Sequence, residues 1–196
     1  GKRLAVQVAG AKDDIWIYEF ARGTFLRLTL EGTNINPTWS PEGKQLTFTS
    51  LRDGQFGIFL RSADGSGGEE KLTTAPKETA QAVESWAPNG KVLSFGEWSA
   101  TDQGDIWILP LEGDRKPRPF LRTPFSEFFS SFSPDGHWIV YTSDESGRYE
   151  VYVRPYPGPG GKWQISTEGG EEPIWSANGD ELFYRNGEKW MVTKVQ

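Results

Sequence analysis

The sequence predicts an all-β protein, a β-propeller of four-stranded antiparallel blades. The first observation is a repeated phrase: WSPEGKQLTF, which begins at Trp39, recurs as WAPNGKVLSF at Trp86, FSPDGHWIVY at Phe132 and WSANGDELFY at Trp175. The second is the spacing, because the turn glycines are 42 to 47 residues apart, counted from a partial copy, GKRLAVQV, at the start. The third is the lack of any helical period in a chain with 23 glycines and 13 prolines. Four strands in each repeat of about 45 residues are typical of propeller blades.

Each repeat reads as four strands joined by tight turns. The first strand ends on the aromatic residue, and the turn after it places glycine where a positive φ costs least. In the second strand, Leu46 and Phe48 alternate with Thr47 and Thr49, which is the period of a strand with two different faces. The third strands are DIWIYEF, FGIFLRS, DIWILPL, YEVYVRP and KWMVTKV. The fourth strands are FLRLT, EKLTT, RPFLRT and WQIST.

The repeated aromatic and glycine residues are expected to be architectural. We place the aromatic side chains in the core, where neighbouring blades face one another, and the glycines in the turns. This structural repeat consists of Trp39, Trp86, Phe132, Trp175, Gly43, Gly90, Gly136 and Gly179.

The repeat divides one predicted domain, residues 1–196, into five units. Their expected bounds are 1–35, 36–80, 81–126, 127–170 and 171–196. Three units are complete, the first lacks its inner strand and the last lacks its outer strand. We therefore expect eighteen strands, which make about five blades or a fragment of a larger ring.

The two partial units would leave two blade faces without a neighbour. Leaving ~800 Å² of apolar surface in water forfeits on the order of 20 kcal/mol. That exceeds the ~5–15 kcal/mol by which a typical domain is stable. We expect the faces to be covered in one of three ways: a closed five-bladed ring with two thin blades, a homo-oligomer that closes the ring, or further blades of a larger propeller. A start in mid-turn without methionine favours a processed or truncated product.

The repeat resembles a known bacterial family. WSPEGKQLTFTSLRDGQFGIFLRSADGSGGEEKLT resembles the TolB-like β-propeller repeat, a WD-like repeat whose pattern runs W-S-P-D-G-K, S-x-R-D-G, D-G-S-G and L-T. The likeness is clearest in residues 37–74 and 130–154, and YVRPYPGPGGKWQIST also resembles the propellers in the C-terminal regions of bacterial serine/threonine kinases. The resemblance implies a ring of six or more blades, hence a fragment here, and a periplasmic or otherwise extracytoplasmic location.

Composition excludes several classes of function. The chain has 21 basic and 27 acidic residues, a net charge of −6 and no basic cluster, so nucleic acid is not an expected partner. No apolar run approaches the ~18 residues of a membrane helix, so no membrane insertion is expected. Without cysteine there is no thiol chemistry, and the single histidine, His137, excludes His-rich metal sites by count. A Ser-His-Asp triad is not expected, because nothing in the sequence places His137 near a serine held by rigid elements.

Acidic residues gather in the crossovers that lead into the inner strands. In a propeller these segments line the rim of the axial channel, so we expect a ligand-binding rim. Its candidate residues are Glu78, Glu84, Glu127, Glu171 and Glu172. Four interpretations remain open: a solvated rim, a Ca²⁺ site made of carboxylate and carbonyl oxygens, recognition of a basic peptide or ligand, and the acids of a glycosidase. No cofactor other than Ca²⁺ is considered.

The segment GEWSATDQGD, residues 96–105, is a second candidate. It is longer than the matching SLRDGQ and SDESGR segments, and it carries Trp98 among polar residues. Aromatic residues on loops often anchor partners, so this is a candidate partner loop, although packing on a neighbouring blade is the favoured role of Trp98.

Together these observations favour a non-catalytic scaffold that presents loops to a protein or small ligand. The alternative is an enzyme, either a propeller glycosidase or the accessory propeller of a prolyl-peptidase-like hydrolase. A glycosidase would require two carboxylates within roughly 5–10 Å of each other.

Overall fold

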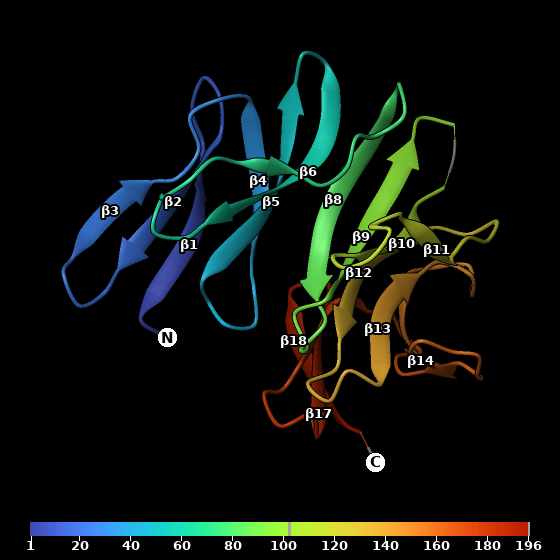
Figure 1. Ribbon diagram of the computed structural model, residues 1–196. Helices are drawn as coiled ribbons and strands as arrows, with labels where there is room; N and C mark the ends of the chain where they lie inside the picture. Colours follow the sequence, from blue (N-terminus) through green and yellow to red (C-terminus); the bar gives the residue numbers. More distant parts are fainter. Residues whose placement is uncertain (102, 196) are drawn as a thin grey trace. The chain divides into compact units, whose positions relative to one another are not determined.

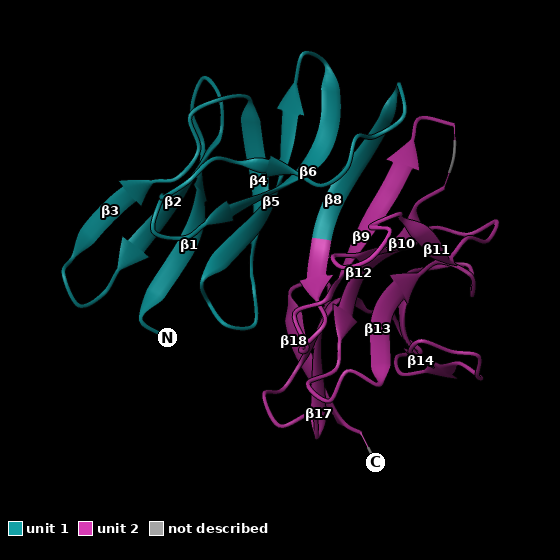
Figure 2. Cartoon of the chain, viewed as in Figure 1, with its two compact units in different colours: residues 1–83 teal, residues 84–196 magenta. Residues whose placement is uncertain are grey.

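A computed structural model describes residues 1–101 and 103–195 as eighteen β-strands in five antiparallel sheets, with no helix in those residues (Figure 1). The predicted all-β fold class is confirmed. No described segment forms a helix that could span a bilayer. The chain divides into two compact units, residues 1–83 and 84–196 (Figure 2).

Unit 1 holds the first two sheets. The first sheet has the strand order β1-β2-β3 and the second has the order β4-β5-β6-β7. Their strands are β1 Arg3–Val8, β2 Asp14–Glu19, β3 Thr24–Arg27, β4 Thr33–Trp39, β5 Gln45–Arg52, β6 Gln55–Ser62 and β7 Glu70–Lys71. β4 begins before residue 36 because Thr33 already pairs with Leu51 of β5.

The remaining strands form three sheets, and β8 runs from unit 1 into unit 2. The third sheet has the order β11-β10-β9-β8, the fourth β12-β13-β14-β15 and the fifth β16-β17-β18. The strands of the third sheet are β8 Thr79–Trp86, β9 Val92–Ser99, β10 Asp105–Pro110 and β11 Arg118–Leu121. Those of the other two are β12 Glu127–Phe132, β13 Trp138–Ser143, β14 Glu150–Pro155, β15 Trp163–Gln164, β16 Glu171–Trp175, β17 Glu181–Asn186 and β18 Lys189–Lys194.

Within each unit, consecutive sheets pack face to face through apolar side chains. In unit 1, Ile15 and Ile17 of the first sheet share a core with Leu46 and Phe48 of the second. In unit 2, one core joins the third and fourth sheets through Ile106, Leu121, Tyr141 and Tyr152. Another joins the fourth and fifth sheets through Val140, Val151, Val153, Leu182 and Tyr184. Within each unit, consecutive repeats therefore bury apolar faces against one another.

The turns follow the sequence prediction. Each of the four turn glycines has a positive φ, between 67° and 80°, and donates its N–H to the carbonyl oxygen three residues earlier. These bonds run from Gly43 to Ser40, Gly90 to Ala87, Gly136 to Ser133 and Gly179 to Ser176. A side chain would be strained at this φ, which explains why glycine recurs there.

The repeated aromatic residues differ in burial. Trp86 and Phe132 are 9% and 6% exposed. Trp39 and Trp175 are half-buried and pack against the edges of the apolar cores. Trp39 is also covered by the guanidinium group of Arg3, which lies 5.1 Å from the ring centre.

The first strands contain a feature that the sequence did not predict. β4, β12 and β16 each have a break in register, and each break holds one residue at a positive φ: Asn36 at 54°, Phe129 at 56° and Glu172 at 54°. A β-bulge of this kind leaves backbone N–H groups that the ladder does not use. Those groups need acceptors from elsewhere in the protein.

Candidate ligand-binding groove

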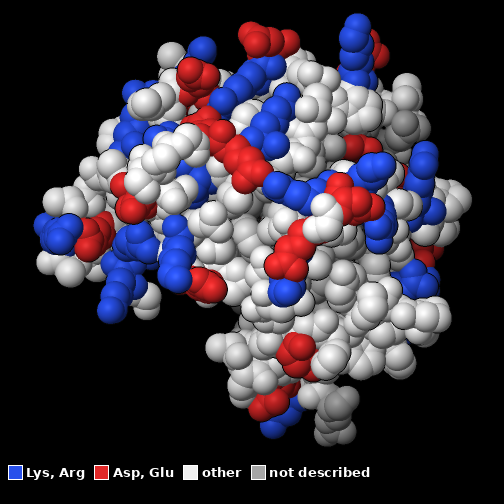
Figure 3. Space-filling view, viewed as in Figure 1, with Lys and Arg blue, Asp and Glu red and all other residues white. Residues whose placement is uncertain are grey.

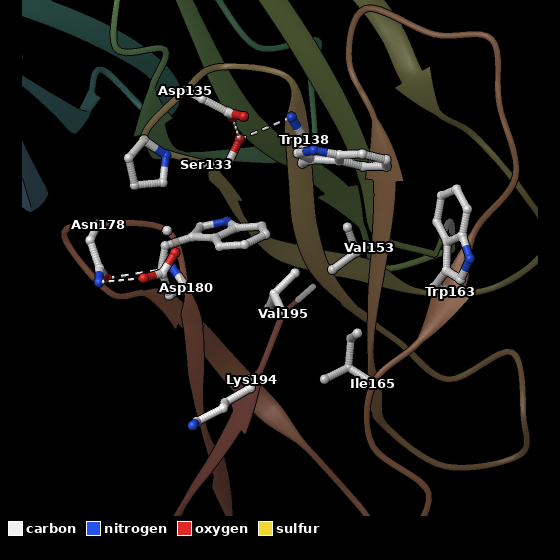
Figure 4. Close-up of a pocket in the computed structure, with 13 residues that line it drawn as sticks. Ser133, Asp135, Trp138, Val153, Trp163, Ile165, Asn178, Asp180, Lys194 and Val195 are labelled. Atoms are coloured by element: carbon white, nitrogen blue, oxygen red, sulfur yellow. Dashed lines mark hydrogen bonds between the residues drawn. The ribbon is translucent and has the colours of Figure 1, made fainter.

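A groove of about 570 Å³ lies between the fourth and fifth sheets of unit 2 (Figure 4). Three tryptophans line it: Trp138 at the start of β13, Trp163 at the start of β15 and Trp175 at the end of β16. The rings of Trp138 and Trp163 meet edge to face, with centroids 5.4 Å apart and planes at 77°. Its size falls within the roughly 300–1,000 Å³ of small-molecule sites.

Strand register explains why two of these indoles meet. Val140 of β13 pairs with Val153 of β14, and Val153 pairs with Trp163 of β15. Since side chains alternate along a strand, Trp138 lies on the same face as Val140 and hence as Trp163. This face is directed toward the fifth sheet, where the groove opens. Trp163 is 52% exposed because β15 is only two residues long and forms the edge of its sheet.

The turn before β13 fixes the polar rim of the groove. The Ser133 hydroxyl accepts the backbone N–H of Trp138 at 3.0 Å and donates to a carboxylate oxygen of Asp135. Asp135 also accepts the backbone N–H of His137 at 3.0 Å. The Ser133 bond, followed by the His137 bond, lowers the pKa of Asp135. Its carboxylate therefore remains ionised at neutral pH.

The corresponding turn of the fifth sheet contributes the opposite part of the rim. The side-chain amide of Asn178 donates to Oδ2 of Asp180 at 2.8 Å, and Lys194 lies at the end of β18. Figure 4 shows Asn178 and Asp180 on one side of the groove and Trp163 on the other. Thus a polar end and an apolar end share one groove.

Several polar atoms of the groove have no hydrogen-bonding partner among the described residues. Two are acceptors, Oδ2 of Asp135 and Oδ1 of Asp180. Three are donors, Nζ of Lys194 and the indole N–H groups of Trp138 and Trp163. The third indole, Trp175, is already used, because its N–H donates to the carbonyl oxygen of Ser131 at 3.1 Å. A ligand in this groove therefore meets both acceptors and donors.

The glutamates predicted to form a rim have different local partners. Glu78 is exposed in the turn before β8, with a φ of 62°. Glu171 and Glu172 both pair with Arg185, which lies 3.6 Å and 3.0 Å away. Arg185 lowers the pKa of Glu172 through a hydrogen bond and its charge.

Glu84 has a structural role at the bulge of β12. Its carboxylate accepts the backbone N–H groups of Phe129, at 2.8 Å, and Ser130, at 2.9 Å, and it also accepts the Ser130 hydroxyl. Burial raises its pKa to about 7, against the lowering effect of these donors. Glu84 therefore supplies the acceptor that the bulge requires.

Glu127 is almost completely buried, with 2% of its surface exposed. One carboxylate oxygen accepts the hydroxyl of Thr123, and the other has no hydrogen-bonding partner. Burial raises its pKa to about 7, and the charges of Asp105, Glu145 and Asp144 add to the effect. No group of three or more acidic or histidine side chains in the described chain has the arrangement of a metal site.

Part of the segment 96–105, which was expected to be a loop, belongs to strands. β9 extends through Ser99 and β10 begins at Asp105, because Glu97 of β9 pairs with Asp105 of β10. Trp98 lies on β9 and is 41% exposed. Asp102 of the predicted loop lies outside the described residues. A partner-binding role for Trp98 stays a prediction.

The residues of the groove were not among the sequence candidates. Trp138 and Trp163 lie outside the repeated WSP positions, at HW and KW, and each follows a glycine-containing turn or loop. An indole on a predicted edge strand was the available signal. The sequence could not show that the two rings meet, because 24 residues separate them and their contact depends on sheet register.

Known proteins give independent evidence on the fold. No protein-family model matches the chain. It is 28% identical over 193 residues to an uncharacterized protein of Agrobacterium fabrum, a match that covers 92% of this chain and 64% of the relative. It is also 28% identical over 119 residues to the Tol-Pal system protein TolB of Bordetella pertussis, across 60% of this chain and 26% of that protein. The chain thus spans less than two thirds of either relative.

Two solved TolB structures share the arrangement of strands. TolB from Acinetobacter baumannii superimposes with a TM-score of 0.79 at 19% identity, over 97% of this chain and 49% of that one. A putative TolB from Agrobacterium tumefaciens gives a TM-score of 0.78 at 17% identity, over 92% of this chain and 65% of that one. The chain is a TolB-like β-propeller. The predicted resemblance is confirmed, and the five sheets correspond to complete or partial blades.

A prolyl endopeptidase contains a similar propeller. It superimposes on this TolB-like chain with a TM-score of 0.72 at 15% identity, over 94% of the chain and 30% of the endopeptidase. At such identity the likeness shows the fold alone. One fold carries many unrelated functions, so the function of this TolB-like propeller has to be argued from its own groove.

Proposed function

We propose that this TolB-like propeller is a non-catalytic module that binds a ligand in the groove between its fourth and fifth sheets. The observation that carries the proposal is the groove itself, where Trp138, Trp163 and Trp175 lie with solvent-exposed carboxylate oxygens of Asp135 and Asp180 that no group in the described chain engages. Concave sites with aromatic walls and a few placed polar groups are the usual form of small-molecule sites. The walls belong to hydrogen-bonded sheets, so little ordering is needed on binding.

The protonation of the acids supports binding over hydrolysis. A glycosidase needs a carboxylic acid whose raised pKa keeps it protonated beside the scissile bond. In the groove, donors lower the pKa of Asp135. The pKa is raised at Glu84 and Glu127, which are instead engaged by Ser130 and Thr123. The groove therefore lacks a recognisable general acid.

Charge and similarity support the rest of the proposal. On the face in Figure 3, acidic and basic side chains are interspersed, and the net charge is −6. This distribution favours a partner other than nucleic acid, whose phosphates require a basic surface. Likeness to TolB of the Tol-Pal system supports an extracytoplasmic location.

The proposal is tested by probing glycan and peptide arrays with the labelled full chain. We expect the wild type to bind one class of probe saturably. Trp163→Ala should bind the same probes with at least tenfold lower affinity. The matched control is Trp190→Ala, which removes an indole that is 62% exposed on β18 and absent from the groove. This control should bind like the wild type. Bound probes should be recovered uncleaved.

Two results would contradict this proposal. If Trp163→Ala and Trp190→Ala lost binding equally, binding would depend on exposed indoles in general. The groove would then not be the site. Steady release of cleaved oligosaccharide or peptide by the wild type would show an enzyme.

A further inference from the structure

We infer that the ligand of this groove is a neutral oligosaccharide. The inference rests on the proposed function and names the chemical class of its ligand. It follows from three features of the groove: the mixture of free donors and acceptors, the aromatic walls and the excess of carboxylates over ammonium groups.

The free polar atoms require a ligand that both donates and accepts. The carboxylates of Asp135 and Asp180 accept only, whereas the ammonium of Lys194 and the indole N–H groups of Trp138 and Trp163 donate only. A sugar hydroxyl does both, and neighbouring hydroxyls on one ring offer several such groups at close spacing. A saccharide therefore offers both the donors and the acceptors that these atoms can bind.

The aromatic walls fit the other surface of a saccharide. A pyranose ring presents a face of C–H groups, which packs on the π-face of an indole, and its hydroxyls project from the edge. In the groove, the half-exposed ring of Trp163 stands beside Val153 and Ile165, away from Asp180 (Figure 4). The apolar end can hold the ring face while the polar end holds the hydroxyls.

The charges favour a neutral saccharide over an acidic one. Asp135 and Asp180 outnumber Lys194 on the groove, and the Ser133 and His137 donors keep Asp135 ionised. A uronic-acid chain would place carboxylates near these two aspartates, which costs free energy through like-charge repulsion. Neutral hexoses avoid this cost.

Peptides match the free donors and acceptors of the groove less well than a saccharide does. A proline-rich segment docks on aromatic grooves and offers carbonyl acceptors but few donors. It would leave Asp135 and Asp180 desolvated without partners, which is costly. A basic peptide would satisfy the aspartates but leave Lys194 beside a like charge.

The inference is tested by isothermal titration of the full chain with cellotetraose and maltotetraose. These two neutral tetrasaccharides differ in linkage geometry. Tetragalacturonate, a proline-rich decapeptide and a lysine-rich decapeptide serve as comparison probes. We expect saturable binding of at least one neutral tetrasaccharide, at least tenfold tighter than that of any comparison probe.

The variants should change the affinity for this tetrasaccharide. Trp163→Ala should weaken the binding tenfold or more, whereas Trp163→Tyr, which keeps an aromatic face, should retain most of it. Asp180→Asn should weaken it several-fold, and Trp190→Ala should leave it unchanged.

Each other outcome decides against the inference in a distinct way. Groove-dependent binding of a decapeptide without binding of the neutral tetrasaccharides would overturn the carbohydrate class and leave the proposed binding function standing. Tighter binding of tetragalacturonate would overturn the neutral class alone. If the wild-type chain, folded as judged by circular dichroism, bound no probe, both the inference and the proposed function would be overturned.

Discussion

Glu127 shows what one buried carboxyl can do in a blade interface. Its side chain is buried near Asp105 of the third blade and Asp144 of the fourth, and one of its oxygens has no partner. An ionised carboxylate without a partner in such a place is costly, so the native state favours the protonated form. Its pKa is accordingly raised to about 7 from 4.5.

This shift predicts a stability that falls as the pH rises. Between pH 4.5 and about 7 the native state holds the proton that the unfolded chain loses. The contribution of Glu127 is therefore fully present below pH 4.5 and lost as the pH rises through about 7. Glu127→Gln should remove this dependence and raise the free energy of unfolding at pH 8 by up to about 3 kcal/mol. Urea denaturation at pH 5 and pH 8 measures it.

The control for this prediction is Glu188→Gln, at an exposed position in the turn between β17 and β18. It should leave the pH dependence unchanged. The prediction is contradicted if the free energy of unfolding changes between pH 5 and pH 8 by the same amount in the wild type and in Glu127→Gln. That result would show that Glu127 is ionised in the native state.

At this scale the sequence predicted residue types better than residue roles. The turn glycines and the buried positions of Trp86 and Phe132 follow from the repeat, because local geometry and apolar surface determine them. The acids were predicted in the crossovers, but Glu84, Glu127, Glu171 and Glu172 lie in the first strands β8, β12 and β16. Some of their partners, such as Ser130 for Glu84, depend on how strands of different blades pack, and no local sequence pattern indicates that packing.

Among the elements, the first strand of a blade differs most from the prediction. The repeat predicted a strand that ends on the aromatic residue, and no pattern in it indicated that β12 bulges at Phe129 and β16 at Glu172. A side chain 45 residues earlier in the sequence, that of Glu84, accepts the freed N–H groups of β12. Because this acceptor belongs to another blade, no local pattern in the sequence could indicate that these N–H groups would find a partner.

Removing the acceptor should destabilise unit 2. Glu84→Ala leaves the N–H groups of Phe129 and Ser130 without the carboxylate, and we expect a loss of about 1–3 kcal/mol. Glu84→Gln keeps one acceptor oxygen and should lose less. Urea denaturation gives the free energies, and hydrogen exchange should be faster at the Ser130 amide in the alanine variant.

A surface glutamate provides the comparison for this pair. Glu112→Ala removes an exposed ion pair with Lys91 and should cost less than about 0.5 kcal/mol. If Glu84→Ala were as stable as Glu112→Ala, with unchanged exchange at Ser130, the carboxylate would not support the bulge.

For the whole molecule, the faces of the two terminal sheets matter most. In unit 1, Leu4 is 48% exposed on the face of the first sheet opposite Ala5, which packs against the second sheet. In unit 2, the paired residues Ile174, Phe183 and Val192 form an exposed row across the fifth sheet. The opposite face of each terminal sheet packs against the neighbouring sheet of its own unit. We expect another blade to cover the exposed faces, from a longer chain or a second copy.

The nine tryptophans allow the binding claim to be tested over the whole chain at once. Their indole N–H signals in a ¹H–¹⁵N spectrum, assigned with single Trp→Phe variants, report on unit 1, on Trp98 and on the groove separately. During titration with cellotetraose and maltotetraose, we predict saturable shifts of Trp138 and Trp163, with Trp16 and Trp190 unchanged. Shifts confined to Trp98, or none at any indole, would contradict the account.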